Sequence, residues 1–164
     1  MADVNNLFMK VDGVKGSSTD KDYKDWIVID NFNLNVTNAS SYDGSSGLTS
    51  GSNVYMTPVN ISKTADVASI PLIDLLQQAK PVKEIILVKT QHINDKRIEE
   101  RRITLKDCFI AAYDSQLQNV SGPTHESFVL AYGIIQQEMN TVTSDGKASK
   151  QGPIGWNRLT NSKL

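Results

Sequence analysis

A polar stretch near the N-terminus contains the residue types that most often bind ions and phosphates. The stretch VDGVKGSSTDKDYKDW, from Val11 to Trp26, mixes glycine, serine, aspartate and lysine between apolar residues. Backbone amides beside glycines can hold a phosphate, and carboxylates can hold a metal ion. The same composition also suits a connection between two strands, or a contact with another copy of the chain.

The spacing in this stretch matches neither a phosphate loop nor a calcium loop. A phosphate loop follows the pattern G-x-x-x-x-G-K-[ST] between a strand and a helix. Gly13 and Gly16 are too close together for that pattern, and the residues after them predict a strand. Oxygen ligands alternate along a calcium loop, yet alternate positions after Asp12 hold Val14 and Gly16. We therefore interpret the stretch as a turn or an interface segment.

The single cysteine is a candidate nucleophile. Cys108 lies in LKDCFIAAY, where a small apolar side chain on a strand is expected to point inward. A pair with His92 or His125 would need hydrogen-bond reach, and no local motif supports it. Two histidines with scattered carboxylates do not form a metal-ligand pattern, and one cysteine cannot form an intrachain disulfide. We expect no enzymatic activity, no cofactor and no metal.

Length and charge narrow the function classes further. A chain of 164 residues is typical of one domain, and we expect residues 1–164 to fold as a single unit. The net charge of -1, without a dense run of Lys and Arg, argues against nucleic acid as a partner. The N-terminal residues lack the features of a cleavable secretory signal, and no segment is long enough to span a membrane. We therefore expect a cytoplasmic protein that does not insert into membranes.

The elements that would position these residues are mostly strands. Alternation of apolar and polar residues predicts six to nine antiparallel strands, because successive side chains of a strand point to opposite faces. One helix is predicted over about residues 69–80, in SIPLIDLLQQAK, with Ser69 as its N-cap. The predicted fold is mainly β: a compact antiparallel β-barrel or two-sheet sandwich with this α-helix on its flank.

Two polar segments do not fit this pattern simply. Thr37 to Asn53 is predicted as a long flexible loop, which in a compact domain either has a binding role or is disordered when free. The segment DKRIEERRITLKD carries charges on both faces of a predicted strand, with Glu99 and Arg101 on the same face as Ile103. It is either a solvated hairpin or an edge strand that pairs charges across a subunit boundary.

Several short pieces occur in an order that resembles the haemolysin-coregulated protein (Hcp) family, the tube-forming proteins of bacterial type VI secretion. VKGSSTDK over 14–21 is similar to the family's VKGES-x-DK, and ITLKD over 103–107 to its ITLK-[ED]. GWN over 155–157, followed by Asn161 and Lys163, is similar to the family's C-terminal end. The chain departs from the family at Ser17, where Glu is usual, and at Phe32 and Leu34, where Trp is frequent.

The resemblance runs from about Phe8 to Lys163 and implies both an architecture and a function. It implies a compact β-barrel with a flanking helix, assembled as a hexameric ring whose copies stack into a tube. It also implies a contractile sheath, a trimeric spike protein and secreted effectors as partners. The protein would be cytoplasmic before firing and secreted afterwards without a cleavable signal. Because the chain has no extension after GWNRLTNSKL, we expect a plain tube subunit without an appended effector domain.

Under this resemblance, the charged and polar loop residues become candidate contacts between subunits or rings. The candidates are Lys15, Gly16, Ser17, Ser18, Asp20, Lys21, Tyr42, Asp43, Glu99 and Arg101. We expect Trp156 to anchor the C-terminus to the domain, because its large apolar surface is best used in packing. Two other functions stay open. A β-barrel can enclose a small ligand, so the chain could be a carrier; Cys108 could also serve a hydrolase.

Overall fold

The computed structural model describes residues 5–164, apart from the side chains of Thr49, Ser52 and Asn53. Strands dominate, and one helix interrupts them. In chain order the elements are β1 (Leu7–Val11), β2 (Ile27–Val28), β3 (Asn31–Asn33), β4 (Val36–Tyr42), β5 (Thr49–Met56), β6 (Val59–Thr64), α1 (Ser69–Gln77), β7 (Val82–Ile93), β8 (Lys96–Ser115), β9 (His125–Ala131), β10 (Ile134–Val142), β11 (Ala148–Asn157) and β12 (Ser162–Lys163). Within residues 5–164, no helix is both long enough and apolar enough to cross a membrane.

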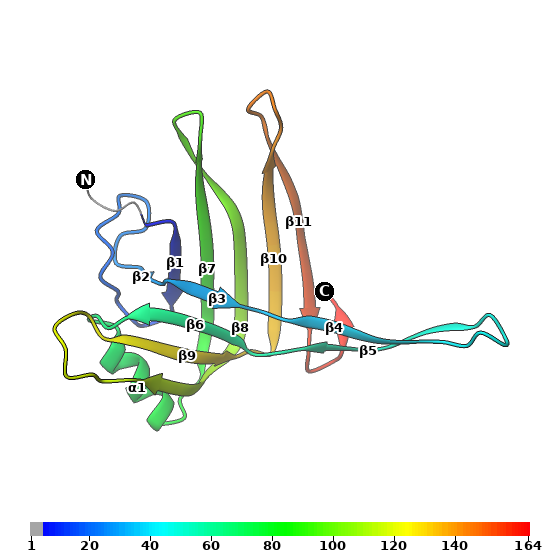
Figure 1. Ribbon diagram of the computed structural model, residues 1–164, viewed down its shortest axis with the longest axis horizontal. Helices are drawn as coiled ribbons and strands as arrows, with labels where there is room; N and C mark the ends of the chain where they lie inside the picture. The colour runs from blue at the N-terminus through cyan, green and yellow to red at the C-terminus, as the bar shows by residue number, and fades with distance from the viewer. Residues whose placement is uncertain (1–4) are drawn as a thin grey trace.

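Ten of the strands form one antiparallel sheet that folds into two layers joined by β8 (Figure 1). The first layer has the order β12-β11-β10-β8-β7-β1-β2, and the second has β3-β6-β9 paired with the end of β8. Lys106 pairs with Ile134 in the first layer, whereas Phe109 pairs with Ala131 in the second. Asp107 lies between them in the left-handed region, at φ 53. The long strand therefore changes layers at Asp107.

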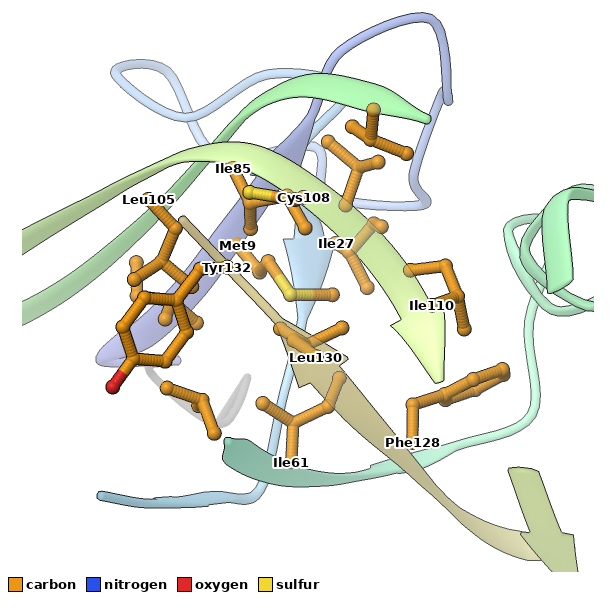
Figure 2. Close-up of a cluster of buried hydrophobic side chains, with 14 of the residues drawn as sticks. Met9, Ile27, Ile61, Ile85, Leu105, Cys108, Ile110, Phe128, Leu130 and Tyr132 are labelled. Carbon is orange, nitrogen blue, oxygen red and sulfur yellow. The ribbon is translucent and has the colours of Figure 1, made fainter. Parts of the chain in front are cut away.

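Side chains from both layers and from α1 form the main core (Figure 2). Alternate positions of each strand point inward, as the period of two predicts. The largest fully buried members are Met9, Ile27, Ile61, Leu72, Ile85, Leu87, Ile103, Leu105, Phe128 and Leu130. Burying a side chain of this size stabilises a fold by about 1.5–3 kcal/mol. This core therefore holds the two layers and the helix together.

The predicted mainly β fold with one flanking helix is confirmed, but the sheet does not close into a barrel. The helix ends at Gln77, earlier than the predicted residue 80, because Ala79 adopts φ 51 and cannot continue it. Ala68 occupies the N-cap position without a side-chain hydrogen bond, so the predicted capping role of Ser69 is wrong. The Ser69 hydroxyl instead takes part in a buried polar cluster.

That cluster surrounds Lys63, which is fully buried. The Lys63 ammonium lies 2.7 Å from Oε1 of Glu126 and 2.8 Å from Oδ1 of Asp66. It also donates to the Ser69 hydroxyl at 3.0 Å, and Ser69 donates to Glu126. Tyr113 completes the cluster, donating to the other Glu126 oxygen at 3.1 Å. These bonds connect β6, β8, β9 and the start of α1 inside the protein, where each charge needs its partners.

We expect Lys63→Met to lower the free energy of unfolding by about 3–5 kcal/mol, because it leaves buried carboxylates without their cation. Urea unfolding of the monomeric chain measures the change. The matched control is Lys89→Met, which removes a half-exposed ion pair with Glu100 at 3.0 Å and should cost less than about 1 kcal/mol. Equal losses in the two variants would contradict a structural role for the buried cluster.

Candidate functional site

Residues 12–26, here called the opening loop, fold back against the domain. The Gly16 amide donates to the Asp25 carbonyl at 2.8 Å, and the Ser18 amide donates to the Trp26 carbonyl at 3.0 Å. A Cβ atom at Gly16 would lie only 2.2 Å from the Trp26 carbonyl oxygen. Glycine is therefore required at position 16 for the two arms of the loop to approach each other.

Aromatic packing fixes the loop on the face of the first layer that points away from the main core. Tyr23 is buried and stacks on Phe8, with ring centroids 4.6 Å apart. Trp26 meets Tyr23 edge-on at 5.1 Å. The Arg97 guanidinium lies 5.2 Å from the Phe8 ring and 5.0 Å from the Tyr23 ring. Phe8, Tyr23 and Val88 thus form a second, smaller core beneath the loop.

Charges reinforce this attachment. Asp20 pairs with Arg97 at 2.6 Å and also accepts hydrogen bonds from the amides of Asp22 and Tyr23. Desolvation opposes ionisation of Asp20, but the Arg97 bond and these amide bonds outweigh it and hold its pKa below the ordinary value. The Asp20 carboxylate is therefore paired within the chain and is not a free metal ligand.

The hydroxyl of Tyr23 extends this attachment into a chain of polar contacts. It donates to Glu99 at 2.8 Å, and Arg102 donates to the same carboxylate at 2.9 Å. Burial raises the pKa of Tyr23, and the hydrogen bond to Glu99 adds to this effect. For Glu99, desolvation is outweighed by the bonds from Arg102 and Tyr23, so its pKa is lowered. A neutral phenol and an ionised carboxylate are therefore maintained side by side.

The predicted contact residues of the opening loop fall into two groups. Gly16 and Ser18 are buried, and Ser17, although exposed, donates to Asp66 at 3.1 Å. Two lysines point to solvent: Lys15, whose only ion pair among residues 5–164 is with Asp25 at 3.5 Å, and Lys21. The loop therefore presents Lys15 and Lys21 to solvent beside the exposed Asp12 and Asp22, while Gly16, Ser18 and Asp20 maintain its shape.

Glu99 and Arg101 do not share a face, contrary to the prediction. The register of β7 and β8 shifts between Lys89 and Thr90, where Lys89 pairs with Arg101 and Thr90 pairs with Glu99. This irregularity places an extra residue in β8 and reverses the alternation there. Glu99 consequently points toward Tyr23, whereas Arg101 donates to Gln137 at 2.7 Å on the other face.

The segment predicted as a long loop, Thr37 to Asn53, is instead most of a β-hairpin. Strands β4 and β5 form their own two-stranded sheet, here called the arm. Figure 1 shows the arm crossing in front of β10 and β11 and projecting well beyond them. Tyr42 is 77% exposed and Tyr55 is 68% exposed, and the described residues from 36 to 51 are all exposed. The sequence did not predict this hairpin because its strands contain small polar residues without an apolar alternation.

The turn of the arm is well organised and negatively charged. The Asp43 carboxylate accepts hydrogen bonds from the hydroxyls of Ser46 and Ser45 at 2.6 and 2.7 Å, and from the Ser45 amide at 2.9 Å. The bonds from Ser46 and then Ser45 hold the pKa of Asp43 well below its usual range. Leu48 is 66% exposed beside this carboxylate. The arm therefore ends in an exposed apolar tip with a fixed negative charge.

An open apolar groove lies beside the base of the arm. Its main part has a volume of about 320 Å³ and is lined by Met56, Ile135, Gln137, Ile154, Gly155, Trp156 and Lys163. Trp156 is partly buried and packs against the main core while pairing with Ile135. Its role as the C-terminal anchor stays a prediction. Because the groove is open to solvent, it differs from the enclosed pocket that a small-ligand carrier would need.

Cys108 lacks the surroundings of a nucleophile. The thiol is fully buried, and burial raises its pKa to about 12. A reactive cysteine needs a low pKa and access to substrate. Across residues 5–164, no group of three or more His, Cys, Asp and Glu side chains is arranged to hold a metal ion. The arrangement instead offers surfaces: a charged loop edge, an exposed arm and an apolar groove.

Comparisons with solved structures agree on the fold. The chain is similar to "Structure of a type six secretion system protein", with a TM-score of 0.89 and 24% identity over 98% of this chain and 100% of that one. It is similar to Hcp1 from Salmonella typhimurium, with a TM-score of 0.76 and 22% identity over 97% and 98%. A type VI secretion system effector from Yersinia pestis gives 0.70 and 18% over 93% and 99%.

No curated protein matches the sequence. The family model described as "Type VI secretion system effector, Hcp" matches residues 8–139, which is most of the chain. The match spans the opening loop, the arm and the strand β8 that joins the two layers. The chain therefore belongs to the Hcp family of type VI secretion system effector proteins.

Proposed function

We propose that this chain is the structural tube subunit of a type VI secretion system, forming hexameric rings that stack into a tube. Membership of the Hcp family places it in type VI secretion. The observation that carries the finer proposal is the arm, whose described residues from 36 to 51 are exposed and whose strands pair only with each other within residues 5–164. A second copy of the chain is the proposed cover for this surface.

Physical chemistry supports this use of the arm. An isolated two-stranded hairpin is only marginally stable in water, and the arm exposes Tyr42, Leu48 and Tyr55 together. Association would bury these side chains and order the hairpin at the same time. In a ring, each chain contacts its two neighbours through two different patches, so the arm of one chain would contact a different surface of the next chain. Contacts between different patches of identical chains are heterologous, and they produce rings or stacks.

The opening loop supplies the second proposed contact. Lys15 and Lys21 are exposed on a loop held in place by Gly16, Tyr23 and Asp20. A preformed surface loses little conformational entropy on binding. We therefore propose Lys15, Lys21 and the arm residues as direct contacts. Ser18, Asp20 and Glu99 would act indirectly, by holding the loop.

The remaining parts of the proposal rest on family membership. The tube would be made in the cytoplasm, propelled by a contractile sheath beneath a trimeric spike, and secreted with effectors in its lumen or at its tip. The protein would have a structural role and no enzymatic activity. The raised pKa and full burial of Cys108 support this, because both disfavour a thiolate nucleophile.

The purified protein should form rings with six times the mass of one chain, and these should stack at high concentration. Mass photometry and negative-stain electron microscopy measure both. Strictly monomeric particles at high concentration would refute the proposal.

We expect Lys21→Glu to weaken assembly about three- to tenfold, because it reverses a solvent-facing charge at the proposed contact. Its free energy of unfolding should change by less than about 0.5 kcal/mol, since the side chain is exposed. Sedimentation across a concentration series measures the assembly, and urea unfolding measures the stability. Unchanged assembly would remove Lys21 from the interface.

Asp20, the residue before Lys21, provides a control variant that tests how the opening loop is attached to its own chain. Asp20→Asn should lower the free energy of unfolding by about 1 kcal/mol at pH 7, because it weakens the bond to Arg97. The pKa of Asp20 is lowered in the folded chain, so its contribution is complete above the unfolded value of about 3.9 and is lost as the pH falls through the folded pKa. The difference between wild type and variant should therefore disappear in acid. A difference that persists undiminished below pH 2 would contradict the assignment.

A further inference from the structure

One hydrogen bond connects the opening loop to the segment that precedes the helix. The Ser17 hydroxyl donates to Oδ2 of Asp66 at 3.1 Å, although the two residues are 49 positions apart in the chain. Tyr23 and Asp20 attach the same loop to β1 and β8 of the first layer. Asp66 instead lies between β6 of the second layer and α1. The loop is therefore fastened both to the first layer and to the start of the helix.

Asp66 organises the start of α1. Its Oδ1 accepts a hydrogen bond from the Ala68 amide at 2.9 Å, and its backbone carbonyl accepts one from the Ser69 amide at 3.1 Å. The Asp66 amide in turn donates to the Ser69 hydroxyl at 3.0 Å. Amides at the N-terminus of a helix have no partner within the helix and need one elsewhere. Asp66 supplies two of these partners and also receives the opening loop.

The Asp66 carboxylate is held in place from inside the protein. Oδ1 lies 2.8 Å from the ammonium of Lys63, which is fully buried and also pairs with Glu126 on β9. Tyr113 on β8 donates to the second Glu126 oxygen. The residues Lys63, Asp66, Ser69, Tyr113 and Glu126 are here called the Lys63 cluster. Buried ion pairs add little net stability compared with apolar side chains, but in some proteins they specify a single arrangement.

We propose that the Lys63 cluster is a positioning device for the opening loop, acting through the bond between Asp66 and Ser17. The cluster orients Asp66, and Asp66 holds both Ser17 and the first turn of α1. Loop and helix start therefore open together and not independently. A partner that binds the exposed Lys15 of the loop would consequently change the stability of α1, because coupling between two sites is reciprocal. The proposal concerns the single chain and does not depend on the proposed tube function.

The variant Ser17→Ala tests the coupling from the side of the loop. Native-state hydrogen exchange should show the amides of Ala68 and Ser69 exchanging about two- to tenfold faster than in the wild type, as expected for the loss of one hydrogen bond. The matched control is Thr19→Ala. Thr19 is exposed in the same loop, and its side chain makes no hydrogen bond with any of residues 5–164, so these rates should stay unchanged.

Amides of the main core separate coupling from a general loss of stability. Leu87 and Ile103 are buried in paired central strands, and their amides should exchange at the wild-type rate in Ser17→Ala. Acceleration confined to the loop and the start of α1 would support the proposal. Equal rates at Ala68 and Ser69 in Ser17→Ala and Thr19→Ala would overturn it. Equal acceleration of the core amides would overturn it as well, because the loop would then act only on global stability.

The variant Ser69→Ala tests the coupling from the side of the cluster. It removes the hydroxyl that contacts Lys63 and Glu126 inside the protein. The amides of Gly16 and Ser18, which bond across the opening loop, should then exchange about two- to fivefold faster, while the core amides should not change. The matched control is Ser41→Ala, which removes a hydroxyl bond to Ser50 in the arm. Loop amides that exchange no faster in Ser69→Ala than in this control would overturn the proposal.

Discussion

One strand determines how the rest of the chain can be arranged. β8 is 20 residues long, and its first part pairs with β7 and β10 while its last part pairs with β9. The change of layer occurs at Asp107, whose φ of 53 bends the strand, and the Gly133 amide donates to the carbonyls of both Lys106 and Asp107 at 3.0 and 3.1 Å. Because both layers contain this strand, the bend brings their inner faces together around the main core.

The two layers differ in length, and this difference leaves part of the first layer uncovered. The second layer covers only part of the first, so the core fills the covered region and leaves Ile154 and Met139 in the open groove. The opposite face of the first layer is covered by the opening loop, which adds its own small core around Tyr23. Asp20 of that loop and Glu99 of β8 are paired with Arg97 and Arg102 inside the chain, whereas Lys21 is exposed.

Much of this fold could be predicted from the sequence, because it depends on periodicity. The strands, the helix and the inward position of Cys108 follow from apolar alternation and helical spacing. Lys63 was missed although it continues the inward series of Val59 and Ile61, since an isolated lysine usually predicts a solvent-facing side. The irregularity in β8 that separates Glu99 from Arg101 leaves no pattern in the sequence. The arm was missed because its strands are stabilised by backbone pairing between small polar residues.

If a neighbouring chain completes the arm, amide hydrogen exchange in the arm should slow when the protein assembles. Exchange should be compared residue by residue between dilute monomer and assembled protein. The amides of the arm, from Val36 to Met56, should become strongly protected on assembly. The amides of the main core should be protected in both states. Arm amides that exchange equally fast in the two states would show that no neighbouring chain covers the arm.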